Sequence, residues 1–218
     1  KARETLSKIS ASIEMKYLGD IVRELAITLK GGYQLHVRSA TLHSVLLAVS
    51  EVYTSTEIHS SENMPPFDLC VPSMMDLIQQ DVFGVASEMK EAQDVKKRVI
   101  KEAMGVKSYH SLEIIGRCIN FNPTKDGINV NGQLCMSSVH SLITPFLERL
   151  RDPELEKSII GKVKECLNRI VLGLSQNATS TPEKVLPFVH DTVSSFIHEN
   201  SNENNTSDLD DSDDDEMI

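Results

Sequence analysis

The residues of this sequence best suited to recognising a charged partner form one basic group near its middle. The group consists of Lys96, Lys97, Arg98 and Lys101. Side chains of this kind contact nucleic-acid phosphates without reading base sequence, and in a helix Lys97 and Lys101 would share one face. The group therefore predicts RNA-phosphate contact. The competing interpretation is a solvated helix face balanced by three nearby glutamates, because no aromatic side chains are interleaved for base stacking.

Patterns that would indicate catalysis or metal binding are weak. His36 and His43 are seven residues apart, whereas zinc-binding pairs on one helix favour a spacing of four with a third ligand nearby. The sequence contains no G-x-S-x-G elbow, and Gly31-Gly32 lacks the spacing of a phosphate-binding loop. We therefore predict no enzyme activity, no cofactor and no metal site. A helical enzyme whose site has no local motif is the alternative.

The last eighteen residues are strongly acidic. Eight of the 32 acidic residues lie in 201–218, which has no Lys or Arg, and this leaves 24 acidic against 22 basic residues before Ser201. A segment with so little apolar surface cannot offset the entropy cost of ordering, so we predict a disordered tail over 201–218. Ser207 and Ser212 precede acidic residues and are candidate phosphorylation sites. The tail is either a binding segment for basic partners or a solubilising linker.

Composition favours an all-α protein that lies outside a membrane and in a reducing compartment. Aromatic residues make up 5% of the 218 residues and Trp is absent, so the apolar content suits helix layers better than a β-sandwich. The four cysteines are widely spaced without a CxxC pair and are expected to be reduced and mostly buried. No apolar run reaches the roughly 18 residues that span a bilayer. Because the sequence begins at Lys1, we expect a fragment or a processed product.

Apolar residues recur at three- and four-residue steps along most of the chain, which predicts a series of amphipathic helices. Gly31-Gly32 is expected to cap the second of them, Pro72 to lie in a first turn, and Pro153 and Pro182 to open helices. Residues 87–107 are expected to form an exposed helix or helical linker. The apolar stripes lie within residues 6–13, 17–29, 33–53, 71–85, 109–119, 139–150, 159–174 and 185–197.

Polar and proline-containing stretches divide these helices into groups. The expected organisation is helical repeats over 1–53, a loop over 54–66, helical repeats with the charged helix over 67–119, a polar loop over 120–133, helical repeats over 134–200 and the tail. Asn131-Gly132 can also close a β-hairpin, so a small hairpin is the alternative to a loop there. Met74 and Met75, with Met64 and Met89, are interpreted as core filling, with an adaptable binding surface as the alternative.

Each predicted helix has an apolar face that it cannot bury alone. Stacked helical hairpins solve this problem, so the predicted fold class is an all-α, HEAT/armadillo-like helical-repeat solenoid segment. A compact helical bundle is the alternative.

Several short segments, in the same order along the chain, resemble one known family. They are Lys1-Ala-Arg-Glu-Thr-Leu, Lys16-Tyr-Leu, Arg23-Glu-Leu, Gly32-Tyr-Gln-Leu-His-Val37, Val82-Phe-Gly84, Val106-Lys-Ser-Tyr109 with Glu113-Ile114, and Pro182-Glu-Lys-Val-Leu186. The family is that of the large HEAT-repeat, U3-associated proteins of the small-subunit processome, also called the down-regulated in metastasis family. The segment Gly-Tyr-Gln-Leu-His-Val is the most specific of these matches. Residues 54–66 and 120–132 depart from the family pattern, and both lie in predicted loops.

The resemblance implies a non-enzymatic scaffold for ribosome biogenesis in the nucleus and nucleolus. Such a protein would bind pre-rRNA in the U3 snoRNP-containing pre-ribosomal particle, together with assembly factors and ribosomal proteins, and would support rRNA processing to 18S rRNA. It implies no membrane partner and no small-molecule substrate. A HEAT-type protein–protein adaptor in another pathway, such as nuclear transport, is the alternative function.

Overall fold

The computed structural model describes residues 1–31, 34–53, 65–84, 107–124, 128–130 and 133–206, and the other residues lie outside this description. The chain divides into two compact units, 1–180 and 181–218. The elements of the first unit are α1 (Ala2–Ser12), a 3-10 turn (Met15–Tyr17), α2 (Leu18–Thr28), α3 (Gln34–Tyr53), α4 (Pro66–Leu69), α5 (Val71–Phe83), α7 (Lys107–Cys118), β1 (Ile128–Val130), β2 (Gln133–Cys135), α8 (Ser138–Leu150) and α9 (Lys157–Ser175).

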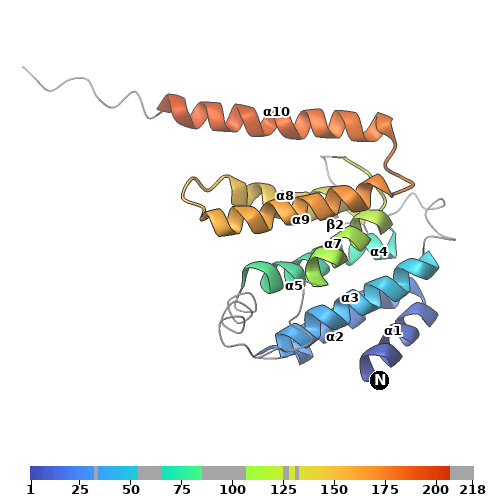
Figure 1. Ribbon diagram of the computed structural model, residues 1–218. Coiled ribbons are helices and arrows are strands. Elements are labelled where there is room, and N and C mark those ends of the chain that lie inside the picture. The colour runs from blue at the N-terminus through green and yellow to red at the C-terminus, as the bar shows by residue number, and fades with distance from the viewer. Residues whose placement is uncertain (32–33, 54–64, 85–106, 125–127, 131–132, 207–218) are drawn as a thin grey trace, which may run out of the picture. The chain divides into compact units, whose positions relative to one another are not determined.

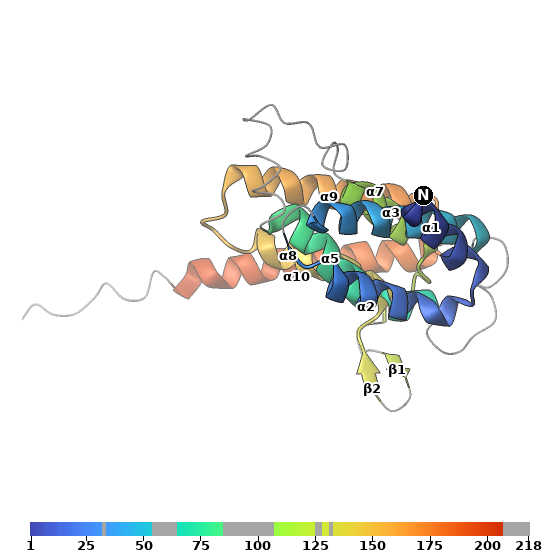
Figure 2. The ribbon, with the colours of Figure 1, turned by 90° about the horizontal axis from the view of Figure 1, so that it is seen from below.

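The helices of the first unit form two parallel rows, seen most clearly in Figure 2. One row is α1, α3, α7 and α9, each packed against the next, and the other is α2, α5 and α8. Successive helix pairs (α2 with α3, α5 with α7, α8 with α9) therefore stack side by side, as Figure 1 also shows. This repeated stacking is the geometry of a helical-repeat solenoid. The predicted all-α, HEAT/armadillo-like fold class is confirmed.

The core lies between the two rows and is built from the predicted apolar stripes of the central helices. Fully buried side chains include Leu46 of α3, Ile78 of α5, Ile115 of α7 and Phe146 of α8. Burying each such side chain contributes roughly 1.5–3 kcal/mol. Met74 and Met75 are also buried, as the core-filling interpretation predicted, and Pro72 lies in the first turn of α5. Met64 and Met89 lie outside the described residues.

The free cysteines Cys70, Cys118 and Cys166 are buried, as expected. Burial raises the pKa of each of these thiols, to about 11 or 12.

Among the described residues no helix is long and apolar enough to cross a membrane.

Helix α1 buries a different face from the one that its sequence predicts. Ser7 and Ser10 are its buried residues, whereas Ile9 is 50% exposed and Ile13 is exposed as well. The two serine hydroxyls donate to the carbonyls of Arg3 and Leu6 in the preceding turn, so they need no partner on α3. Small residues with internally satisfied hydroxyls allow α1 to pack on α3, and the apolar stripe remains outside.

Two predicted helix boundaries are wrong. The C-cap of α2 is Leu29, with an ordinary negative φ, and Gly31 has no left-handed φ, while Gly32 lies outside the described residues. Gly31 instead accepts a hydrogen bond from the Gln34 N–H. Helix α9 begins at Lys157 rather than at Pro153, because Asp152 accepts the Glu154 N–H and closes a separate turn.

The polar segment predicted as a loop over 120–133 contains an antiparallel β-hairpin. Strands β1 and β2 pair in the register Ile128 to Cys135 and Val130 to Gln133. Only two residues, Asn131 and Gly132, separate the strands in the sequence, and Asn-Gly is the dipeptide most suited to a two-residue hairpin turn. The turn signal therefore outweighed the polar composition on which the loop prediction depended.

The second unit is described through one helix, α10 (Pro182–Thr206), which opens at Pro182 as predicted. It continues through Thr206, six residues into the segment predicted to be a disordered tail, and 207–218 lie outside the description. Most of the apolar residues predicted to be buried are exposed, and these are Leu186, Val189, Val193 and Ile197. Val185 and Phe196 are half-buried, while Phe188, which was not in the predicted stripe, is buried.

Candidate functional site

The four basic residues predicted to contact RNA all fall in 85–106, outside the described residues. Ser207 and Ser212 lie outside them too. The described residues do show how the two ends of the basic segment are held. In the sequence the segment follows α5 and precedes Lys107, the first residue of α7. The contacts of α5 and α7 therefore hold the two points of the chain between which the basic residues lie.

Asp81 and Ser108 connect the two ends of this segment inside the core. The Ser108 hydroxyl, in the first turn of α7, donates to Asp81 Oδ2 at 2.7 Å, and both residues are buried. Arg38 of α3 is buried beside them and donates to the Gln80 side chain at 3.0 Å. Burial lowers the pKa of Arg38, and the nearby Asp81 charge opposes that shift. The Asp81 charge thus offsets part of the desolvation cost of Arg38 at the base of the basic segment.

Asp68 of α4 performs the same task for the hairpin segment. Its carboxylate accepts the Asn120 N–H at 3.1 Å and the Ser138 hydroxyl. Asn120 follows α7 and Ser138 begins α8, so one buried carboxylate holds the start and the end of the segment between them. Burial raises the pKa of Asp68 from 3.8 to about 6, although both hydrogen bonds act to lower it. Desolvation is therefore the larger effect.

Helices α7 and α9 approach closely where two glycines face the opposing backbone. A Cβ on Gly173 would lie 2.2 Å from the Glu113 carbonyl oxygen, and a Cβ on Gly116 would lie 2.9 Å from that of Ile170. Both distances are too short for real Cβ contacts, so any side chain at these positions would separate the helices. Neither glycine was identified as important from the sequence. The available signal was their occurrence inside helical patterns, where glycine often has a packing reason.

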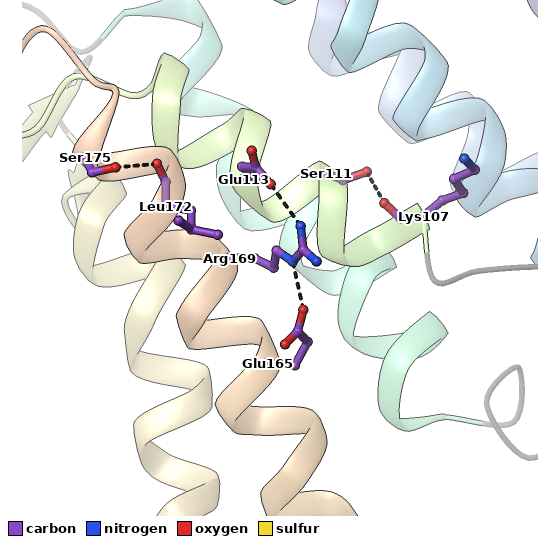
Figure 3. Close-up of polar contacts among 7 residues, drawn as sticks. All are labelled: Lys107, Ser111, Glu113, Glu165, Arg169, Leu172 and Ser175. Carbon is purple, nitrogen blue, oxygen red and sulfur yellow. Dashed lines mark hydrogen bonds and ion pairs between the residues drawn. The ribbon is translucent and has the colours of Figure 1, made fainter.

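A charged cluster covers the partly exposed edge of the same helix crossing (Figure 3). Arg169 of α9 donates to Glu165 at 2.8 Å and to Glu113 of α7 at 3.2 Å. The hydrogen bonds that Arg169 donates to Glu165, and then to Glu113, raise the pKa of Arg169. Because the three side chains remain partly in water, the cluster adds little stability.

Asn177, just after α9, caps the end of α7. Its Nδ2 donates to the carbonyls of Gly116 and Ile119 at 2.8 and 2.7 Å. Two residues on, Thr179 Oγ1 accepts the Phe121 N–H at 2.8 Å. These bonds satisfy backbone groups that the end of α7 would otherwise leave unpaired. Asn177-Ala178-Thr179 also matches a glycosylation sequon, but both amide hydrogens of the buried Asn177 are engaged, which keeps this amide from modification in the folded chain.

The two histidines considered for metal binding lie in different environments. His36 is buried, whereas His43 lies beside His110 of α7, with ring centroids 6.0 Å apart. Burial, with Lys107 and His110 nearby, lowers the pKa of His43 to about 4. In the described part of the chain no group of three His, Cys, Asp or Glu side chains could hold a metal ion.

A groove of 1110 Å³ lies between α1, α2 and α3. Its floor is largely apolar, with Leu6, Leu25 and Leu29 among its lining residues, while Glu4 and Glu24 lie exposed along its edges. Lys1, Arg3 and Asp20 also line the groove, so titratable side chains of both signs accompany the apolar ones.

These features define a class of protein: a helical-repeat segment whose charged and polar side chains hold its helices and its two inserted segments in place. The model of the "U3 small nucleolar RNA-associated protein 20 domain" family matches residues 1–193. The chain belongs to this family.

Two curated relatives agree with this assignment. The chain is 31% identical over 197 residues to U3 small nucleolar RNA-associated protein 20 of Schizosaccharomyces pombe, and 31% identical over 188 residues to the protein of the same name from Saccharomyces cerevisiae. These alignments cover 90% and 86% of the chain. The chain spans only 7% and 6% of the length of these relatives.

Proposed function

We propose that this chain is a scaffold segment of a small-subunit processome component that supports 18S rRNA maturation in the nucleolus. The match over most of the chain to proteins named for U3 small nucleolar RNA carries the proposal. In this function the stacked helices present an extended surface to pre-rRNA, the U3 snoRNP, assembly factors and ribosomal proteins. The segment performs no reaction of its own.

The basic residues Lys96, Lys97, Arg98 and Lys101 supply the RNA-phosphate contacts of this proposal. The observation favouring them is the built base of their segment, where Asp81 and Ser108 join its two ends at 2.7 Å. A charged segment tied firmly to a rigid body places phosphate contacts at a fixed position on the particle. Phosphorylation at Ser207 and Ser212 would add negative charge to the tail and weaken its attraction to RNA.

The test is RNA capture with the tagged full-length protein, followed by sequencing of the bound RNA in a salt series. We expect pre-rRNA and U3 RNA, and their complete absence at low salt would refute the ribosome-assembly function in favour of an adaptor role elsewhere. Changing all four basic residues to glutamate should lower the slope of log binding constant against log salt by about 3, because each contact to single-stranded RNA contributes roughly 0.7.

A matched control separates these contacts from bulk charge. In this control variant four exposed lysines elsewhere in the chain are changed to glutamate: Lys8, Lys16, Lys157 and Lys164. This variant has the same net charge as the first. We expect it to retain most of the RNA bound by the unchanged protein, and an equal loss in both variants would contradict a specific role for the basic segment.

A further inference from the structure

The β1–β2 hairpin is an arm with a rigid base. Asp68 holds the Asn120 N–H and the Ser138 hydroxyl at its two ends, and Phe121 at its start is buried and bonded to Thr179. Beyond this base the two strands extend away from the helix rows, as Figure 2 shows. Three polar contacts, one of them fully buried, thus hold the two ends of the segment that carries the hairpin.

The strands of this arm offer unused backbone hydrogen-bonding groups along both edges. In the described part of the chain each strand pairs only with the other. With a two-residue connection, the pair Val130 and Gln133 shares ladder hydrogen bonds, as does the pair Ile128 and Cys135. The N–H and C=O groups of Asn129 and Leu134, the pair between them, therefore point outward. A hairpin of two short strands is marginal in water by itself, so a third strand would stabilise it.

The composition of the arm favours protein over RNA as its partner. Residues 120–138 contain one lysine, one aspartate and no arginine, so they offer almost no charge for phosphate contacts. Met136 beside β2 is instead an apolar side chain that is 55% exposed, and it suits contact with a protein surface.

We propose that the arm is a docking site for an extended polypeptide segment of a partner protein, which adds as a third strand beside Asn129 or Leu134. Main-chain hydrogen bonds would supply the affinity, as in other cases of strand addition. This site goes beyond the RNA scaffold proposed above and requires neither the basic segment nor U3 RNA.

The test uses the full-length protein in cells, with the photo-cross-linker p-benzoylphenylalanine in place of Met136. We expect a cross-linked polypeptide that is identified by mass spectrometry and is insensitive to ribonuclease. Either Asn129→Pro or Leu134→Pro should reduce its yield by roughly tenfold, because proline removes the outward N–H of one edge without touching the ladder. Asn129→Ala and Leu134→Ala keep the N–H and should leave the yield within about twofold.

Three results would overturn the proposal. The first is a cross-link that ribonuclease removes. The second is a cross-link yield that stays unchanged in both proline variants. The third is a yield from position 136 no greater than the yield with the cross-linker at Ile27, an exposed residue of α2. Replacing residues 128–135 with two glycines keeps the base and provides a check that does not depend on proline. This variant must lose the cross-link, and its retention also overturns the proposal.

Discussion

Replacing Gly173 with alanine should destabilise the chain, although alanine is the better helix former. The new Cβ would lie 2.2 Å from the Glu113 carbonyl oxygen and 3.0 Å from the Arg117 nitrogen, both backbone atoms of α7. Because backbone cannot rotate away, the two helices must separate, and overpacking of this kind costs up to about 3 kcal/mol. Alanine regains about 1 kcal/mol of helix propensity. The net loss is therefore about 2 kcal/mol.

Gly161 of the same helix provides the matched control, since a Cβ there would meet nothing within 4 Å. Gly161→Ala should stabilise the chain by about 0.5–1 kcal/mol. In thermal unfolding followed by circular dichroism, we expect Gly173→Ala to lower the Tm by about 4–8 °C and Gly161→Ala to raise it by about 1–4 °C.

A second glycine tests whether both positions belong to one helix crossing. Gly116→Ala should cost less than Gly173→Ala, because its shortest contact is 2.9 Å. The double variant should lose less than the sum of the two, since one separation of α7 and α9 relieves both clashes. If Gly173→Ala unfolded at or above the Tm of Gly161→Ala, the close approach of α7 and α9 would be refuted.

Three further predictions concern the polar side chains. The folded-state pKa of Asp68 is raised from 3.8 to about 6, so its contribution to stability is present below pH 4 and is lost as the pH rises through 6. In urea denaturation, the unchanged chain should therefore lose roughly 2–3 kcal/mol more unfolding free energy between pH 4 and 7 than the Asp68→Asn variant loses. Parallel curves of unfolding free energy against pH for the two chains would contradict this. Asn177→Ala should cost about 1–3 kcal/mol, because it removes the donor to the Gly116 carbonyl and leaves the Ile119 carbonyl with only the 3.3 Å bond from Thr179 Oγ1, whereas Asn168→Ala on the exposed face of α9 should be nearly neutral in the same assay. Glu113→Gln should cost no more than about 1 kcal/mol, and a loss that persisted in 1 M NaCl would show that its pairing with Arg169 is not a screened surface contact.

The sequence predicted the central helices well because their apolar periodicity and their burial have the same cause. In α5, for example, Met74, Ile78 and Val82 recur at helical spacing and are all buried. The same argument failed for α1 and α10, where Ile9 and Val193 follow the helical period yet are exposed. Periodicity shows that a helix has an apolar face, but it does not show which neighbour covers that face.

The buried polar residues could not have been predicted for a different reason. Asp68 follows two prolines, a position at which an aspartate would ordinarily cap or turn the chain on the surface. Its actual partners, Asn120 and Ser138, lie 52 and 70 residues away. Such long-range pairing leaves no local pattern, so the anchoring of both inserted segments emerged only with the fold.

The two anchoring aspartates explain how a solenoid can carry insertions without losing its regular stacking. Asp81 meets Ser108 at the start of α7, and Asp68 meets Ser138 at the start of α8. In both places the chain returns from an inserted segment into a row helix, and the buried carboxylate fixes that point of return. An insertion of any length costs only slowly increasing loop entropy once its ends are held. The segments between can then vary in sequence to suit their partners, while the helix rows keep one spacing. Weakening one aspartate should therefore alter the segment it anchors more than the other segment.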